Sequence, residues 1–311
     1  MSLRSLILAT YINSGLFFLP IQMLPQKFSE LESLATQIPI QNCVECNNFC
    51  TIKELKSIAK SITVKIISET GWGSGIILKQ EGEVYTVITN QHVLNTNNNS
   101  YLIQTPDGIF YQANKIENEN FQGNDLALLE FRSTHSIYAV ASLENSTTLS
   151  LGDKTFAAGF PTLEKSEDTE FLLTRGRVSI LSKQPLEKGY QVGYTNVVKK
   201  GMSGGPLLNI YGQVVGINGM HAYPLWGNPY VYRDGSEPTL TLRQKMSHLA
   251  FAIPMETVAK LAPNFASIST IKFDETVSIK FLNYLFFDDF GELLNWQFYP
   301  YILSTSCHGN S

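Results

Sequence analysis

Gly201-Met202-Ser203-Gly204-Gly205-Pro206 is the stretch that decides the fold and the chemistry predicted for this chain. A serine hydroxyl is a poor nucleophile, so a reactive serine needs a neighbouring base and a tight turn that presents it. Glycines on both sides of Ser203 permit such a turn, because glycine tolerates positive φ and leaves room for a bound molecule. An apolar segment follows directly. The stretch therefore predicts a nucleophile loop that leads into a strand, rather than an ordinary turn.

A histidine is expected to activate Ser203, and the chain contains five histidines. His92 stands just after the apolar segment 84–88. Asp125 stands where a strand over 126–131 is predicted to begin, a place where a carboxylate can be buried and still accept hydrogen bonds. We therefore expect His92 as the base and Asp125 as its partner. Three further histidines have no motif around them, namely His135, His248 and His308.

Short apolar segments, separated by clusters of glycine, asparagine and aspartate, follow one another along the middle of the chain. Segments of this kind are typical of β-strands bounded by turns. Strands are predicted over Ile62–Ser68, Ser74–Lys79, Tyr85–Thr89, Tyr101–Gln104, Leu126–Phe131, Phe156–Ala158, Phe171–Leu181, Tyr190–Tyr194, Gly205–Leu208, Gln213–Ile217 and Phe251–Ile253. Many short strands with few helices indicate an all-β sandwich or barrel and not a parallel α/β sheet.

Two short helices flank these strands in the prediction. Thr51 and Glu54 have the spacing of a capping box, in which each side chain bonds the other residue's backbone N–H. A helix over 52–60 is therefore expected before the first strand. Pro254 precedes a second apolar segment, which predicts a closing helix over 255–262.

The sequence resembles the trypsin-like serine peptidases of the chymotrypsin fold, especially the bacterial high-temperature-requirement proteases and glutamyl endopeptidases. The resemblance covers roughly residues 61–262, and the order His, Asp, Ser along the chain agrees with it. It implies two six-stranded β-barrels with a closing C-terminal helix, and a site in the cleft between the barrels. Four segments carry it, with support from Phe251-Ala252-Ile253-Pro254: Gly73-Ser74-Gly75-Ile76-Ile77, Thr89-Asn90-Gln91-His92-Val93, Asn124-Asp125-Leu126-Ala127 and Gly201-Met202-Ser203-Gly204-Gly205-Pro206.

The resemblance also implies a role for each site residue. Ser203 would attack the carbonyl carbon of a peptide bond, His92 would take the serine proton, and Asp125 would orient His92 and stabilise its charged form. The backbone N–H groups of Gly201 and Ser203 would hold the oxyanion that forms. No cofactor or metal is expected, because this chemistry needs neither and no cluster of metal ligands is evident in the sequence.

Substrate preference is expected to depend on Val197 and on one wall of the pocket. In the trypsin branch an acidic residue six positions before the serine attracts Lys or Arg, and Val197 occupies that position here. The strand that forms the other wall would place four further residues at the substrate, namely Asn218, Gly219, Met220 and His221. Glutamyl endopeptidases usually carry a histidine where Asn218 falls. A preference for uncharged residues is therefore expected, and His221, three residues further on, is not expected to take the place of that histidine.

Composition excludes some functional classes and leaves others open. Hydrophobic residues make up 43% of the 311-residue chain, and the net charge is -4. A nucleic-acid partner is not expected, because such proteins need a basic face. Peptide or protein substrates are expected instead. Two alternatives stay open: a non-catalytic peptide-binding module on the same fold, and an esterase that uses the same triad.

The chain is expected to divide into four parts. Residues 1–26 are interpreted as a signal peptide or membrane anchor, because Arg4 is followed by a long uncharged and largely apolar stretch. The protein is therefore expected to be exported to the periplasm or outside the cell, or anchored to a membrane and facing outward. Residues 27–60 are expected to be a linker with a cysteine cluster and the short helix, 61–262 the peptidase domain, and 263–311 an aromatic-rich extension of unknown role.

Cysteine usage fits export, where thiols are oxidised. Three cysteines cluster before the first helix and the fourth lies near the end of the chain: Cys43, Cys46, Cys50 and Cys307. A disulfide that staples a loop is favoured over a zinc site, because ligand pairs at zinc-finger spacing are missing. The sequence leaves the pairing of these cysteines open.

Overall fold

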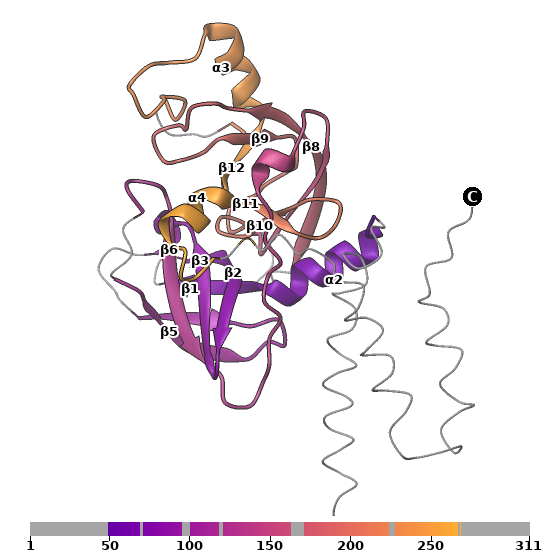
Figure 1. The fold of residues 1–311 in the computed structure, drawn as a ribbon, viewed down its shortest axis with the longest axis vertical. Coiled ribbons are helices and arrows are strands. Elements are labelled where there is room, and N and C mark those ends of the chain that lie inside the picture. Colours follow the sequence, from indigo (N-terminus) through magenta and orange to yellow (C-terminus); the bar gives the residue numbers. More distant parts are fainter. Residues whose placement is uncertain are drawn as a thin grey trace, which may run out of the picture. The chain divides into compact units, whose positions relative to one another are not determined.

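Two closed barrels of six strands each form the part of the chain that is described, residues 49–68, 71–94, 100–117, 121–162, 171–223, 228–266 and 268 of a computed structural model. All neighbouring strands in both barrels are antiparallel. The strands of the first barrel are drawn in indigo and purple in Figure 1, and those of the second barrel mostly in pink to orange. The predicted chymotrypsin-like double barrel is confirmed.

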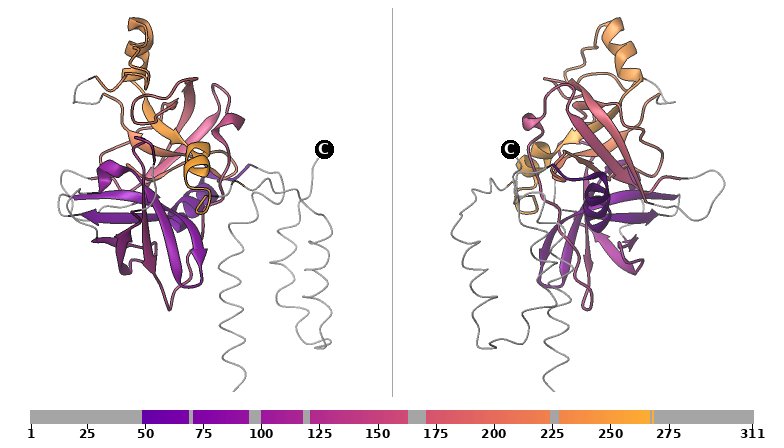
Figure 2. Two further views of the ribbon diagram at one scale, coloured as in Figure 1. Left: turned by 60° about the vertical axis from the view of Figure 1, so that its left-hand side comes forward. Right: turned by 90° about the vertical axis from the view of Figure 1, so that its right-hand side faces the viewer.

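The order of the strands around each barrel is as follows. The first barrel contains, in spatial order, β1 (Thr63–Ser68), β2 (Gly71–Glu81), β3 (Val84–Thr89), β6 (Ala127–Arg132), β5 (Phe110–Lys115) and β4 (Ser100–Gln104). The second contains β10 (Pro206–Leu208), β11 (Val214–Met220), β12 (Ala250–Pro254), β9 (Val192–Tyr194), β8 (Leu172–Leu181) and β7 (Lys154–Gly159). The two views of Figure 2 show the same grouping of strands from other sides.

Alternation along the strands builds one core inside each barrel and a third core between them. Successive side chains of a strand point to opposite faces of the sheet. On β2 and β3, Ile77 and Val87 belong to the core of the first barrel, whereas their neighbours Ile76 and Ile88 belong to a cluster that both barrels share. The outer face of these two strands is therefore apolar, and it is covered by the second barrel.

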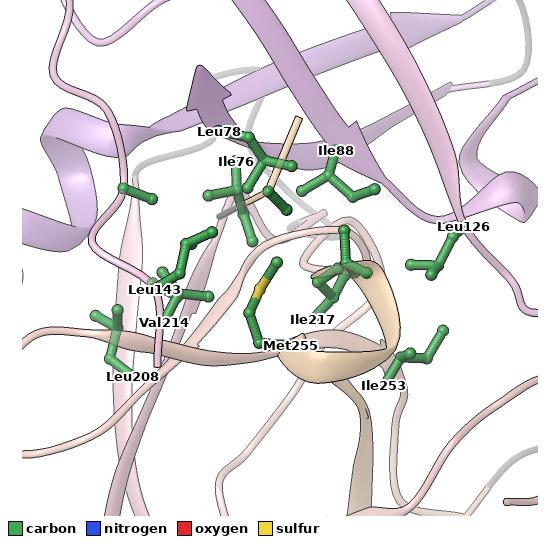
Figure 3. Packing of buried hydrophobic residues seen from close by; sticks show 14 of the residues in the cluster. Ile76, Leu78, Ile88, Leu126, Leu143, Leu208, Val214, Ile217, Ile253 and Met255 are labelled. Carbon is green, nitrogen blue, oxygen red and sulfur yellow. The ribbon is translucent and has the colours of Figure 1, made fainter. Parts of the chain in front are cut away.

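The second barrel meets this face with residues arranged in the same way. Val215 of β11 lies inside the second barrel, while Val214 and Ile217 lie in the shared cluster. Met255, the first residue of helix α4 (Met255–Leu261), joins them there (Figure 3). All four side chains are fully buried. The shared cluster fixes the two barrels against each other and so fixes the positions of any groups between them.

The two predicted helices form, and one further α-helix was not predicted. Helix α2 (Ile52–Ile62) has both reciprocal bonds of the capping box between Thr51 and Glu54, and it continues two residues beyond its predicted end. Helix α4 starts after Pro254, as predicted, and ends one residue early. Helix α3 (Leu240–Ser247) was missed, because only Met246 in it is buried and no apolar stripe marks it.

Strand β5 was also missed, for a similar reason. Within Phe110–Lys115 only Ala113 is fully buried, so the apolar alternation that marks a half-buried strand is absent. The strand forms because its backbone pairs with β4 and β6 and so closes the first barrel. Single short 3-10 turns, η2 (Gln91–Val93) and η3 (Ser146–Thr148), complete the described elements.

Several predictions fall outside the described residues. These are the apolar segment 1–26, most of the linker 27–60 before residue 49, most of the extension 263–311, and all the cysteines except Cys50. Cys50 itself is disulfide-bonded. Among the helices that the structure describes, none is both long and apolar enough to cross a membrane.

Candidate active site

His92 is positioned by the end of β3. The strand stops at Thr89, and the chain then passes through the fully buried Asn90 into the single turn η2, which contains His92. The Asn90 side-chain amide donates to the backbone oxygen of Asp125 at 2.8 Å. This bond ties the histidine segment to the segment before β6, so the two predicted partners are brought together by the backbone as well as by their side chains.

The Asp125 carboxylate accepts three hydrogen bonds and is almost fully buried. The backbone N–H of His92 donates to Oδ1 at 2.9 Å, and Nδ1 of the same ring lies 2.5 Å from Oδ2. The Tyr190 hydroxyl donates to Oδ2 at 2.6 Å. An imidazole that donates through Nδ1 leaves Nε2 as its proton acceptor. The arrangement therefore prepares His92 to act as a base through Nε2.

The pKa of Asp125 is set by two opposing effects. Burial alone would raise it, but the hydrogen bond from His92, the positive charge that His92 can carry, and the hydrogen bond from Tyr190 together bring the pKa below its ordinary value. Asp125 thus stays ionised at neutral pH although it is buried. A buried carboxylate with donors on both oxygens is held in one orientation.

Ser203 lies on a turn whose two glycines cannot be replaced without a collision. Gly201 and Gly204 have φ values of 92° and 84°, which other residues rarely adopt. A Cβ at Gly204 would meet the backbone oxygen of Ser74, and one at Gly201 would meet the backbone oxygen of Phe160. The serine turn therefore packs directly against the backbone of β2 and of the segment after β7.

Ser74 of the first barrel holds this turn in place. The backbone N–H of Ser74 donates to the backbone oxygen of Ser203 at 2.8 Å, and the Ser74 hydroxyl donates to the backbone oxygen of Gly201 at 2.8 Å. Its own backbone oxygen accepts from the hydroxyl of Thr89 at 2.7 Å. A continuous path of hydrogen bonds thus runs from the serine turn, through β2, to the end of β3 where the histidine segment begins.

The hydroxyl of Ser203 is bonded to Gly219 and not to His92. It donates to the backbone oxygen of Gly219 at 3.4 Å, and no hydrogen bond joins it to the His92 ring in the described part of the chain. The structure thus brings His92 and Asp125 together and places Ser203 on a turn tied to the same strands. A serine hydroxyl can rotate to a new acceptor, and catalytic hydrogen bonds are often long before substrate binds.

Two backbone N–H groups of the turn have no acceptor among the described residues. The other N–H groups of the turn donate to backbone oxygens: that of Met202 to Lys199, that of Gly204 to Asn218, and that of Gly205 to Met202. No such bond is formed by the N–H of Gly201 or of Ser203. These are the two groups predicted to hold an oxyanion, and both are free to donate to a bound carbonyl oxygen.

The predicted pocket residues are dispersed, and two of them need correction. Asn218 is fully buried, and its carboxamide bonds the Tyr194 hydroxyl at 2.7 Å and the oxygens of Ala158 and Pro206 at 3.2 and 2.9 Å. Met220 is buried in the shared core. Asn218 bonds groups of the second barrel, and Met220 follows a bulge in β11 that places it in the shared core. Both side chains are enclosed by the protein, so neither can line a substrate pocket.

The other three predicted pocket residues remain near the surface or the serine. Val197 is 61% exposed. Gly219 offers its backbone oxygen to Ser203. The ring nitrogen Nδ1 of His221 lies 2.7 Å from the backbone oxygen of Ala222. Val197 is therefore exposed to solvent, whereas Gly219 contacts the candidate nucleophile.

Tyr190 and Ser74 bond residues of the candidate site, and the sequence analysis predicted neither contact. Ser74 lies in the quoted segment before the histidine, but nothing in a serine between two glycines identifies a brace for a turn far along the chain. Tyr190 was assigned only to a strand, and its contact with Asp125 spans 65 residues. Neither contact has a local signal in the sequence.

No group of three or more potential metal ligands occurs among the described residues. His135, outside the site, is exposed. His248 bonds the hydroxyl of Tyr223. His308 lies outside the described residues.

Comparison with known proteins agrees with the fold. Residues 73–217 match the family described as trypsin-like peptidase domain. A serine protease Do-like HtrA of Bacillus subtilis is 32% identical over 161 residues, which cover 49% of this chain and 34% of the relative. A probable periplasmic serine endoprotease, DegP-like, of Buchnera aphidicola is 31% identical over 159 residues, covering 50% and 31%. The chain thus matches about a third of the length of these relatives.

A solved structure shows the same fold. The serine endoprotease from Yersinia pestis superimposes with a TM-score of 0.50 and 20% sequence identity, over 70% of this chain and 66% of that one. At this identity the likeness concerns the fold alone.

Acid should remove the stabilisation that Asp125 provides. Since its pKa in the folded chain is depressed, its contribution to the free energy of unfolding is complete above the ordinary carboxyl range of ~4 and is lost as the pH falls through the folded value. We expect Asp125→Asn to lower the free energy of unfolding by about 2 kcal/mol at pH 7, and this difference should shrink below pH ~4. Urea unfolding of both proteins at several pH values measures it. A difference that stays constant or grows in acid would contradict the depressed pKa.

Proposed function

We propose that the protein is a serine endopeptidase with His92, Asp125 and Ser203 as its catalytic triad, because residues 73–217 match the family described as trypsin-like peptidase domain. One observation carries the proposal: the 2.5 Å bond between Nδ1 of His92 and the buried carboxylate of Asp125. Asp125 holds His92 beside the strands that also anchor the turn of Ser203. This arrangement supports activation of Ser203 by His92.

The proposed reaction has two halves. Oγ of Ser203 attacks the carbonyl carbon of a peptide bond while Nε2 of His92 takes the hydroxyl proton, and the C–N bond then breaks as His92 gives that proton to the leaving amine. Water, deprotonated by His92, next attacks the acyl-enzyme ester, and the acid product leaves Ser203 with its proton restored. Asp125 remains ionised throughout and stabilises the charged imidazole.

The serine turn is proposed to stabilise the negative oxygen of both tetrahedral intermediates. The backbone N–H groups of Gly201 and Ser203 have no acceptor among the described residues, which supports this role. Preorganised donors act strongly because they need no rearrangement as charge develops. The collisions that a Cβ would cause at Gly201 and Gly204 support a turn that keeps this geometry.

Peptides or proteins are the proposed substrates, and an exported protein is the proposed setting. The name of the Buchnera relative describes a periplasmic protein, and the disulfide at Cys50 suits an oxidising compartment. The largely apolar N-terminal segment 1–26, which carries no charged side chain after Arg4, is proposed as the signal or anchor, with membrane association in the second case.

The two alternative functions make different predictions about cleavage. A peptide-binding module would leave substrates intact, and the bond of the Ser203 hydroxyl to Gly219 is the observation that favours it. An esterase would use the same acyl chemistry on esters alone. The triad arrangement favours the peptidase, and digestion of a protein substrate separates the peptidase from both alternatives. Fluorophosphonate labelling of Ser203 then separates an esterase from a binding module.

Replacement of the triad residues should remove activity and leave the fold intact. We expect Ser203→Ala and His92→Ala to lower the rate of fluorescein-casein digestion at least ~10³-fold, because the nucleophile or its base is lost. His135→Ala is the matched control, since His135 is exposed and lies outside the site, and it should digest casein at the parent rate. Circular dichroism should show a folded chain in each case. Undiminished digestion by purified Ser203→Ala would refute the proposal.

Cleavage should favour uncharged residues before the cut bond. Val197 offers no carboxylate to pair with a Lys or Arg side chain, and a cation without a partner costs several kcal/mol to bury. We expect aliphatic or small residues at this position in a peptide-library digest, and a modest shift toward Lys and Arg in Val197→Asp. Because Val197 is 61% exposed, this shift should be small. Predominant cleavage after Lys or Arg by the parent chain would show that Val197 does not determine the preference.

A further inference from the structure

A tyrosine of the second barrel reaches the aspartate of the candidate triad in the first. Tyr190 lies just before β9, and its hydroxyl donates to Oδ2 of Asp125 at 2.6 Å. Tyr190 is 5% exposed and Asp125 6% exposed. Bulk water therefore does not replace this bond if the hydroxyl is removed, and Oδ2 would retain only its contact with His92.

The backbone around Tyr190 is tied to the backbone around Asp125. The N–H of Asp125 donates to the oxygen of Lys188 at 3.0 Å, and the N–H of Leu186 donates to the oxygen of Tyr190 at 3.0 Å. Gly189 has a φ of 90°, and a Cβ there would collide with the side chain of Asn124. The loop that carries Tyr190 is thus seated closely on the segment that carries Asp125.

Gly219 leaves the space through which the tyrosine ring passes. A Cβ at Gly219 would collide with the hydroxyl and with Cε1 of Tyr190. The backbone oxygen of the same glycine accepts the hydroxyl of Ser203. The ring of Tyr190 therefore lies between the candidate acid and the strand on which the candidate nucleophile rests, and the absence of a side chain at position 219 is what allows it.

The charges in this region keep the tyrosine as a donor. Burial, and then the nearby charge of Asp125, raise the pKa of Tyr190 well above its ordinary value, so the hydroxyl keeps its proton. Its bond in turn helps to lower the pKa of Asp125. The guanidinium of Arg233 donates to Asn124 at 2.6 Å and does not bond the carboxylate. Among the described side chains, only His92 and Tyr190 bond the Asp125 carboxylate.

From this geometry, and resting on the proposed function, we propose that Tyr190 is a positioning residue of the triad. Its hydroxyl crosses from the second barrel, through the space left by Gly219, and fixes the Asp125 carboxylate in the orientation that supports His92. Tyr190 acts through Asp125 and touches no reacting atom. The contact also makes the alignment of the triad depend on the packing of the two barrels.

The test measures how fast a fluorophosphonate probe labels Ser203, from pH 5 to 9. We expect Tyr190→Phe to lower the second-order labelling rate at pH 7.5 by about 10- to 100-fold, since a hydrogen bond to a buried charge is lost. Without the tyrosine donor, Asp125 concentrates more negative charge toward His92 and stabilises its protonated form. The acidic limb of the labelling profile should therefore move to higher pH.

The matched control is Tyr85→Phe. Tyr85 is as deeply buried, and its hydroxyl accepts from the backbone N–H of Tyr138 in the first barrel, away from Asp125. This variant is expected to lose stability but to keep the labelling rate within twofold of the parent, with an unchanged acidic limb. If Tyr190→Phe does not fold, Gly219→Ala displaces the same hydroxyl and should show the same slower labelling and the same shift.

The outcomes separate the positioning role from the proposed function. A parent protein that the probe does not label at Ser203 contradicts the proposed function. A labelled parent, together with a Tyr190→Phe variant that is labelled within twofold as fast, overturns the positioning role alone. Slower labelling with an unshifted acidic limb overturns it as well, because general loosening of the fold would explain that result.

Discussion

The buried carboxylate of Asp125 is bonded from both barrels, and the geometry of the candidate site depends on it. His92 of the first barrel and Tyr190 of the second donate to the same oxygen, and the Asp125 N–H donates to Lys188. An isolated buried carboxylate would be costly, so these donors are needed for it to remain ionised. The apolar cluster between the barrels fixes the position of the first-barrel donor, His92, relative to the second-barrel donor, Tyr190.

The serine turn is bound across the same boundary. Ser74 of the first barrel bonds the backbone of Gly201 and of Ser203, and Gly204 approaches Ser74 too closely for any side chain. The candidate nucleophile Ser203 therefore belongs to the second barrel in sequence but is anchored to the first. Relative motion of the barrels would disturb all three residues of the candidate triad together, so the cluster around Ile76 and Ile217 matters for the site as well as for stability.

Local patterns predicted most of the fold and the backbone of the site. Alternation in apolar segments marks strands such as β3, whereas β5 carries one fully buried residue and becomes a strand only through its neighbours. The glycines beside Ser203 predict the turn, because the positive φ values at Gly201 and Gly204 favour glycine. Long-range contacts have no such signature: the Tyr190 bond, the burial of Asn218 in the second barrel and the burial of Met220 in the shared cluster depend on how distant segments meet.

Mapping the residue that reacts with a fluorophosphonate tests the central claim most directly. The oxygen of an activated serine attacks the phosphorus of the probe and displaces fluoride, and a neighbouring base must take the serine proton for this to occur. The site of the adduct therefore reports activation and not mere exposure. Peptide mapping by mass spectrometry of the labelled protein should find the adduct on Ser203, and the adduct should be absent from His92→Ala. Labelling elsewhere, or equal labelling of Ser203 in His92→Ala, would contradict the account, because the reactivity of Ser203 would then not depend on the histidine that Asp125 holds.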